Sequence, residues 1–199
     1  VGEAYRLFRN TFRYQLSNLF DFDAARDAVP VAEMDTLDRW ALHQTAVLVR
    51  ECGAAYDAYE FHRVYQLCNQ FCAVTLSATY HDVLKDRLYT HGTRSALRRS
   101  SQTALHGIFH TLVRLLAPIL SFTAEEIWGF LPGEREASVF HATWHRFPAI
   151  PAYGIDWEAL IGLRTQVAGE LGSFGRQVAM KCKTLSVEAG SHQRQQQRG

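Results

Sequence analysis

The apolar residues between positions 93 and 117 recur at intervals of three and four, and this is the clearest such pattern in the chain. The pattern comprises Leu97, Ala104, Leu105, Ile108, Phe109, Leu112, Val113 and Leu116. Residues with this spacing fall on one face of an α-helix, so the segment predicts a long helix with one buried side. Pro118 ends or kinks that helix, because proline lacks a backbone N–H and clashes with the preceding turn.

Similar patterns predict helices over residues 3–19, 35–57, 60–83 and 156–181. Asp35 or Thr36 is the expected N-cap of the second of these, and Thr123 with Glu126 forms a capping box that predicts the start of a short helix ending at Leu131. The apolar face of residues 60–83 is so wide that it indicates burial on more than one side. No alternation long enough for a sheet is present, so the sequence predicts an all-α fold, an antiparallel helical bundle.

Length and composition agree with an ordinary soluble protein. The 199 residues are 47% hydrophobic and 21% charged, which suits one large domain with or without an appendage. We expect a helical domain over 1–150, a C-terminal helix and the start of a junction to a next domain over 151–190, and a disordered polar tail over 191–199. No apolar run approaches the roughly 20 residues of a membrane span. Four cysteines without disulfide-scaffold spacing indicate free thiols and a cytoplasmic location.

The motifs of catalysis and metal binding are missing. Cys68 and Cys72 are four residues apart, as are His106 and His110, but neither pair is joined by a second pair of ordinary zinc spacing. No phosphate-binding glycine loop and no nucleophile elbow is present, and the lone serines and cysteines have no evident base. The sequence therefore predicts no catalytic residue, no metal ligand and no cofactor in this chain.

Arginine supplies 18 of the 21 basic residues, and several arginines are clustered. Arg6, Arg9 and Arg13 share an arc of about 60° on the first predicted helix. A second cluster joins the third and fourth helices, and consists of Lys85, Arg87, Arg94, Arg98 and Arg99. The guanidinium group suits phosphate, and nearby aromatic rings such as Tyr14 and Tyr89 could stack on unpaired bases. A solvated or salt-bridged surface would explain the same residues, and the net charge of +1 provides no global attraction to nucleic acid.

An ordered series of motifs then resembles a known family. The motifs include RNT at 9–11, KDRLYT at 85–90 and APILSFTAEEIW at 117–128. They are similar to the helical anticodon-binding domain of class I aminoacyl-tRNA synthetases of the isoleucine, valine and leucine subgroup, and most similar to bacterial isoleucyl enzymes. The resemblance covers residues 1–148 and thins after Gly154. It implies a fragment of a longer enzyme, because the ATP-binding signatures and the editing domain of that family are absent.

The resemblance also implies functional residues. By position it assigns tRNA contacts to Arg9, Asn10, Arg13, Lys85, Arg87 and Tyr89, although Asn10 could instead be structural, as a cap or a bridge between helices. Arg98, from the second basic cluster, is also expected to contact the tRNA. It implies that the fragment is not itself an enzyme, whereas the whole protein would join isoleucine to its tRNA with ATP and magnesium and could carry zinc in a C-terminal module absent here. The expected partner is the anticodon arm of isoleucine tRNA, bound by a monomer. Two alternatives stay open: the equivalent domain of a valyl enzyme, and a structural or protein-interaction bundle that makes no RNA contact.

Overall fold

A computed structural model describes residues 2–144, 150 and 155–173 of the chain. The chain divides into two compact units, Val1–Tyr153 and Gly154–Gly199, and each is described by itself. The first unit is helical throughout its regular structure, and the described residues contain no strand. The all-α prediction is therefore confirmed. The predicted tail at 191–199 lies outside the described residues. No helix in the described part of the chain is both long and apolar enough to cross a membrane.

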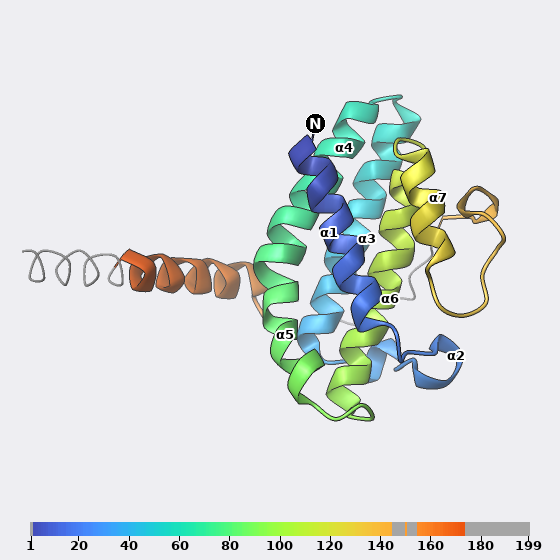
Figure 1. Ribbon diagram of the computed structural model, residues 1–199. Coiled ribbons are helices and arrows are strands. Elements are labelled where there is room, and N and C mark those ends of the chain that lie inside the picture. Colours follow the sequence, from blue (N-terminus) through green and yellow to red (C-terminus); the bar gives the residue numbers. More distant parts are fainter. Residues whose placement is uncertain (1, 145–149, 151–154, 174–199) are drawn as a thin grey trace, which may run out of the picture. The chain divides into compact units, whose positions relative to one another are not determined.

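The first unit is a bundle of long antiparallel helices joined at their ends (Figure 1). Its helices are α1 (Gly2–Asn18), α2 (Ala24–Asp27), α3 (Thr36–Asp57), α4 (Phe61–Gln70), α5 (His81–Thr90), α6 (Ala96–Leu116) and α7 (Ser121–Gly129), with a π-helical stretch η2 (Phe71–Tyr80) and short 3-10 turns η1 (Val31–Glu33) and η3 (Val139–His141). Helix α6 packs against α1, α3, α4, α5 and α7. Its apolar stripe is buried from Ala104 to Leu116, as its spacing predicts, and only Leu97 at its start is partly exposed.

Helix α3 has a defined signal at each end. The Asp35 carboxylate accepts a hydrogen bond from the Leu37 N–H at 3.0 Å, which makes Asp35 the predicted N-cap. At the other end Tyr59 adopts a left-handed conformation with φ of 56°. The Glu60 N–H donates to the Ala55 carbonyl at 2.8 Å and the Tyr59 N–H donates to the Tyr56 carbonyl at 3.0 Å. These two bonds form a Schellman motif, which satisfies carbonyls that the helix end leaves free.

The segments α4, η2 and α5 form one uninterrupted helical rod over residues 61–90. One row of buried residues is spaced by four over the whole length: Val64, Cys68, Cys72, Leu76, Tyr80, Leu84 and Leu88. Phe71, Thr79 and His81 are buried beside this row. In a straight α-helix of 3.6 residues per turn, each step of four would rotate the stripe by about 40°. The π-helical stretch, whose turns hold more residues, compensates for this drift and keeps the row facing the core. The prediction that this helix ends at residue 83 was wrong, because it continues to Thr90.

The predicted capping box at Thr123 was also wrong. Helix α7 begins at Ser121, where the Ser121 hydroxyl donates to the Ala117 carbonyl at 3.0 Å, so Thr123 lies inside the first turn. Nearby Glu125 has a different role, since its carboxylate accepts hydrogen bonds from the Ser138 hydroxyl and the Val139 N–H, both at 3.0 Å. These bonds hold the segment after α7, and the indole N–H of Trp128 adds a bond to the Glu136 carbonyl at 2.8 Å.

The second unit contains a helix over residues 157–173. The Asp156 carboxylate accepts from the Ala159 N–H at 3.0 Å, which confirms Asp156 as the predicted cap. Leu160, Leu163, Val167 and Leu171 form an exposed apolar row along this helix. Residues 174–199 lie outside the described part of the chain.

Candidate nucleic-acid interface

The exposed face of α1 carries a row of arginines. Arg6, Arg9 and Arg13 are all exposed, while Phe8 and Phe12 bury the opposite face of the helix. Within the described residues, none of the three guanidinium groups has a hydrogen-bond or ion-pair partner. Asn10 is exposed as well, and it lies three residues before Arg13 and four before Tyr14, which makes it a surface neighbour of both. This face therefore offers uncommitted donors of the kind that bind phosphate.

Tyr14 connects this face to the start of α5. Its ring stacks on the His81 ring with centroids 4.3 Å apart, and its hydroxyl donates to the His81 carbonyl at 3.2 Å. Burial raises the pKa of Tyr14, and the nearby Tyr89 and Asp82 raise it further. His81 is buried, and this burial, together with the charge of Lys85, lowers its pKa from 6.5 to about 3. The ring of His81 is therefore neutral near pH 7, and it anchors α1 beside α5.

Helix α5 contributes Lys85 and Tyr89 to the same surface. The Tyr89 side chain is 66% exposed, so its ring is open to stacking. Lys85 is exposed and forms an ion pair with Asp82 at 3.1 Å, which is worth little because both side chains are solvated. Five predicted contact residues therefore lie on exposed positions of two neighbouring segments, and these are Arg9, Asn10, Arg13, Lys85 and Tyr89. We call these five residues, together with Arg6, the α1–α5 surface.

Arg87 lies mostly inside the bundle. Its side chain is 18% exposed, and its guanidinium donates to the Asp35 carboxylate at 2.8 Å. A second carboxylate, that of the buried Asp38, lies 3.7 Å from the same nitrogen. Arg87 thus fixes the start of α3 against α5, and a phosphate would have to compete with both acids for it.

Arg98 is more deeply buried than Arg87 and more fully paired with an acid, and this argues against the prediction that it contacts RNA. The residue is 5% exposed. Its guanidinium donates to both oxygens of Asp21, at 2.7 and 3.0 Å, and to the Leu88 and Thr93 carbonyls at 3.3 Å. The bond from Arg98 holds the pKa of Asp21 below its usual value. Arg98 therefore ties the turn after α1 to the start of α6, and we leave it out of the interface.

Sequence reasoning missed a cleft beside this ion pair. It has a volume of about 850 Å³ and lies between α2, the loop before α6 and the first turn of α6. Three arginines line it, Arg26, Arg94 and Arg99, together with the carboxylates of Asp21 and Asp27. The basic cluster at 94–99 was the available signal, but the acids that shape the cleft, Asp21 and Asp27, come from a segment that lies 67 or more positions earlier in the sequence.

Histidine and cysteine carry no site in the described residues. Cys52, Cys68 and Cys72 are buried free thiols, as predicted, and the sulfur atoms of Cys52 and Cys68 lie 3.9 Å apart. Cys182 lies outside the described residues. Burial raises the pKa of Cys72 to about 12. No group of three or more histidine, cysteine or acidic side chains in this part of the chain is placed to hold a metal ion.

Comparison with known proteins bears on this surface. The sequence model of the family described as "Anticodon-binding domain of tRNA ligase" matches residues 38–185. The chain is 50% identical over 175 residues to an isoleucine–tRNA ligase of Halorhodospira halophila, covering 86% of this chain and 19% of that protein. Ligases of the same name from Nitrosococcus oceani and Moorella thermoacetica are 45% and 48% identical, over 84% and 86% of this chain and 18% and 19% of theirs. The chain thus spans about a fifth of the length of these relatives.

Proposed function

Because this chain belongs to the family of anticodon-binding domains of tRNA ligases, we propose that it binds the anticodon arm of a tRNA, and that this tRNA is the one specific for isoleucine. The names of the relatives support the choice of isoleucine over valine. The longer protein would then join isoleucine to this tRNA with ATP and magnesium. The part played by this chain is to hold the tRNA, as a single copy.

The observation that carries the proposal is the row of unpartnered arginines on α1. Like charges on one helix face repel each other, so three uncommitted guanidinium groups within an arc of about 60° favour an anion lying across them. The phosphates of an RNA backbone provide such a row of anions. Asn10, Lys85 and the exposed ring of Tyr89 extend the surface toward α5, where Tyr14 and His81 fix the distance between the two helices.

Contacts to phosphate and contacts to bases make different predictions. Each lysine or arginine that neutralises a phosphate releases bound counterions, so the affinity falls as salt rises. Removing one such residue weakens binding to all tRNAs alike and lowers the slope of log affinity against log salt by about 1. Tyr89, in contrast, would stack on an unpaired base, and its removal would cost affinity without changing the salt slope.

The test is a titration of the purified chain with isoleucine tRNA and with valine tRNA at two salt concentrations. Arg9→Ala, Arg13→Ala and Lys85→Ala are expected to weaken binding and to reduce the salt slope. Arg63→Ala is the matched control, because Arg63 is an exposed arginine of α4 that pairs with Glu60 at 3.3 Å, outside the proposed surface. Unchanged binding in all three variants, beside measurable binding by the unmodified chain, would refute the α1–α5 surface. Absence of binding at low salt would favour a purely structural bundle.

A further inference from the structure

We propose that the cleft lined by Arg26, Arg94 and Arg99 is a subsite for one unpaired RNA nucleotide. The phosphate of this nucleotide would lie on Arg94 and Arg99, and its base on the ring of Phe20, the residue directly before the lining residue Asp21. This inference rests on the proposed function, because it assigns a second contact to the same RNA. It concerns residues outside the α1–α5 surface.

The charges in the cleft leave Arg94 and one edge of Arg99 available. The Asp21 carboxylate is already paired with the guanidinium of Arg98, and Asp27 forms an ion pair with Arg26 at 2.8 Å. Arg94 is exposed and has no hydrogen-bond or ion-pair partner among the described residues. Arg99 directs Nη1 to the Asp21 carbonyl and to Gln102, and the same nitrogen lies 3.7 Å from the Asp21 carboxylate and 3.6 Å from the Asp27 carboxylate. Its Nε and Nη2 make no hydrogen bond within that part of the chain. The two free guanidinium edges provide donors for one phosphate group.

The first turn of α6 adds to the field in the cleft. Ser95 is the N-cap of this helix, but its side chain makes no capping hydrogen bond. The first N–H groups of this 21-residue helix therefore have no side-chain cap, and they point toward the loop that carries Arg94. Both the arginines and the helix end favour an anion at this place.

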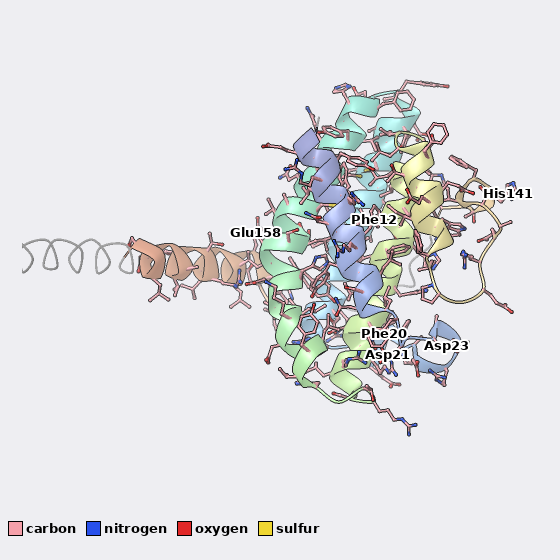
Figure 2. The ribbon with its side chains drawn as sticks, in the orientation of Figure 1. Phe12, Phe20, Asp21, Asp23, His141 and Glu158 are labelled. Atoms are coloured by element: carbon pink, nitrogen blue, oxygen red, sulfur yellow. The ribbon has the colours of Figure 1, made fainter. Side chains whose placement is uncertain are left out.

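Phe20 provides the surface for a base. Its side chain is 76% exposed, although the residues beside it are firmly anchored: Leu19 is fully buried, and Phe22 is buried with its ring 5.6 Å from the His106 ring. The Phe22 N–H donates to the Leu19 carbonyl at 3.1 Å, and this turn holds Phe20 outward. Phe20 directly precedes Asp21, whose carbonyl binds Arg99, and Figure 2 shows Phe20, Asp21 and Asp23 together at the end of the bundle where α1 leads into α2.

The arginines of the cleft and the exposed ring of Phe20 together favour single-stranded RNA over a duplex. A base can stack on an exposed ring only when it has left its own helix, and an anticodon loop offers unpaired bases of this kind. Stacking of a base on an aromatic side chain is worth about 1–3 kcal/mol, independent of which base it is. The cleft volume of about 850 Å³ is within the range of sites for small ligands and leaves room for one nucleotide.

The test compares two RNAs: a hairpin with the sequence of the isoleucine anticodon arm, and a blunt duplex of the same stem without its loop. Phe20→Leu is expected to weaken hairpin binding about tenfold and to leave duplex binding unchanged, and Phe20→Tyr is expected to restore hairpin binding. Arg94→Ala is expected to weaken hairpin binding and to lower its salt slope by about 1. Arg63→Ala again serves as the control.

The possible outcomes separate this inference from the proposed function. If the unmodified chain binds neither RNA, the proposed function fails. The unmodified chain could instead bind the hairpin, and lose this binding in Arg9→Ala and Arg13→Ala. If Phe20→Leu and Arg94→Ala then leave hairpin binding unchanged, the nucleotide subsite alone is refuted. A titration with inorganic phosphate and with adenosine monophosphate distinguishes the sources of the anion. Binding of these small anions that depends on Arg94, with hairpin binding indifferent to it, would make the cleft a general anion site and overturn the assignment to RNA.

Discussion

Tyr80 donates its hydroxyl hydrogen to the Asp38 carboxylate over 2.6 Å, and both side chains are completely shielded from solvent. Asp38 also accepts hydrogen bonds from Ser100 at 2.6 Å and from Ser101 at 3.2 Å, and Arg87 lies 3.7 Å away. One carboxylate thereby connects α3 to η2, α5 and α6. This buried network stabilises the end of the bundle that presents Lys85 and Tyr89.

Asp38→Ala is therefore expected to lower the free energy of unfolding by about 3 kcal/mol, because it leaves buried donors and the Arg87 charge without their acceptor. Urea denaturation followed by circular dichroism measures this loss. Asp57→Ala is the control, since Asp57 is an exposed aspartate in the last turn of the same helix. Equal stability of the two variants would contradict the role of the network.

The titration of Asp38 gives a second prediction. Burial raises its pKa from 3.8 to about 6. Between these values the folded state binds more protons than the unfolded state, so the contribution of Asp38 to stability decreases as the pH rises from about 4 to 6. Asp38→Asn does not titrate, so the stability difference between the unmodified chain and this variant should shrink by up to about 3 kcal/mol over that range. Denaturation of both proteins at a series of pH values measures it, and a constant difference would contradict the raised pKa.

His81 acts in the opposite direction. Its pKa is lowered from 6.5 to about 3, so the unfolded state binds the proton more tightly, and stability is lost as the pH falls below 6.5. Between pH 7 and 5 this one group is expected to cost about 2 kcal/mol. His81→Gln should remove this acid sensitivity and retain a polar side chain beside Tyr14. The same denaturation series tests the prediction, with His43→Gln, at an exposed histidine of α3, as the control.

Arg98 and Arg9 are expected to separate stability from RNA binding. Arg98→Ala breaks a buried ion pair and should lower the free energy of unfolding by about 3 kcal/mol, but the fraction of chain that remains folded should keep its salt slope for RNA. Arg9→Ala should leave stability within about 0.5 kcal/mol and lower the salt slope by about 1. Thermal denaturation and fluorescence titration check the two effects. A changed salt slope in Arg98→Ala would return Arg98 to the interface.

The left-handed backbone at Tyr59 predicts that glycine is more stable than alanine at this position. A residue with a Cβ is strained at φ of 56°, and glycine is not. Tyr59→Gly and Tyr59→Ala lose the same ring contact with Phe61, but only the glycine relieves the backbone. The glycine variant is therefore expected to be about 1 kcal/mol more stable than the alanine variant. Equal melting temperatures would mean that the Schellman motif does not strain the chain.

The sequence was sufficient to predict helices, caps and exposed faces wherever the residues that determine them lie close together in the chain. The stripe from Leu97 to Leu116 specified α6, and Asp35 specified the start of α3. The exposure of Arg9 and Arg13 followed from their position beside the stripe formed by Phe8 and Phe12. In each case the relevant neighbours lie within one or two helical turns, where spacing alone decides which side faces the core.

The sequence was insufficient to predict the role of a side chain wherever its hydrogen-bond or ion-pair partner is distant in the chain. Arg98 was expected to contact RNA as a member of the second basic cluster. Its partner, Asp21, lies 77 positions earlier, and nothing in the local pattern connects the two residues. Asp38 had a local signal, since it is an acid beside the buried Leu37 in an amphipathic helix, but its donors come from residues 80, 100 and 101. The wide apolar face of residues 60–83 was interpreted as burial on more than one side, and this is confirmed, because α4 and η2 both pack against α1 and α3 and α4 also packs against α6. The spacing did not indicate the π-helical stretch that keeps the row from Val64 to Leu88 facing the core.

That stretch also determines where the length of the chain can change. Seven buried residues spaced by four need wider turns than an α-helix provides, and η2 provides them within the rod formed by α4, η2 and α5. Loss of one residue between Cys72 and Leu76 would convert one interval of four into three, the mixture of intervals that a regular α-helix accepts. Loss of one residue from the middle of α3 would instead rotate half of its stripe away from the core by about 100°. A deletion is therefore expected to be better tolerated in η2 than in the middle of α3, so an interior helix joins the surface loops as a place where the length of this domain can change.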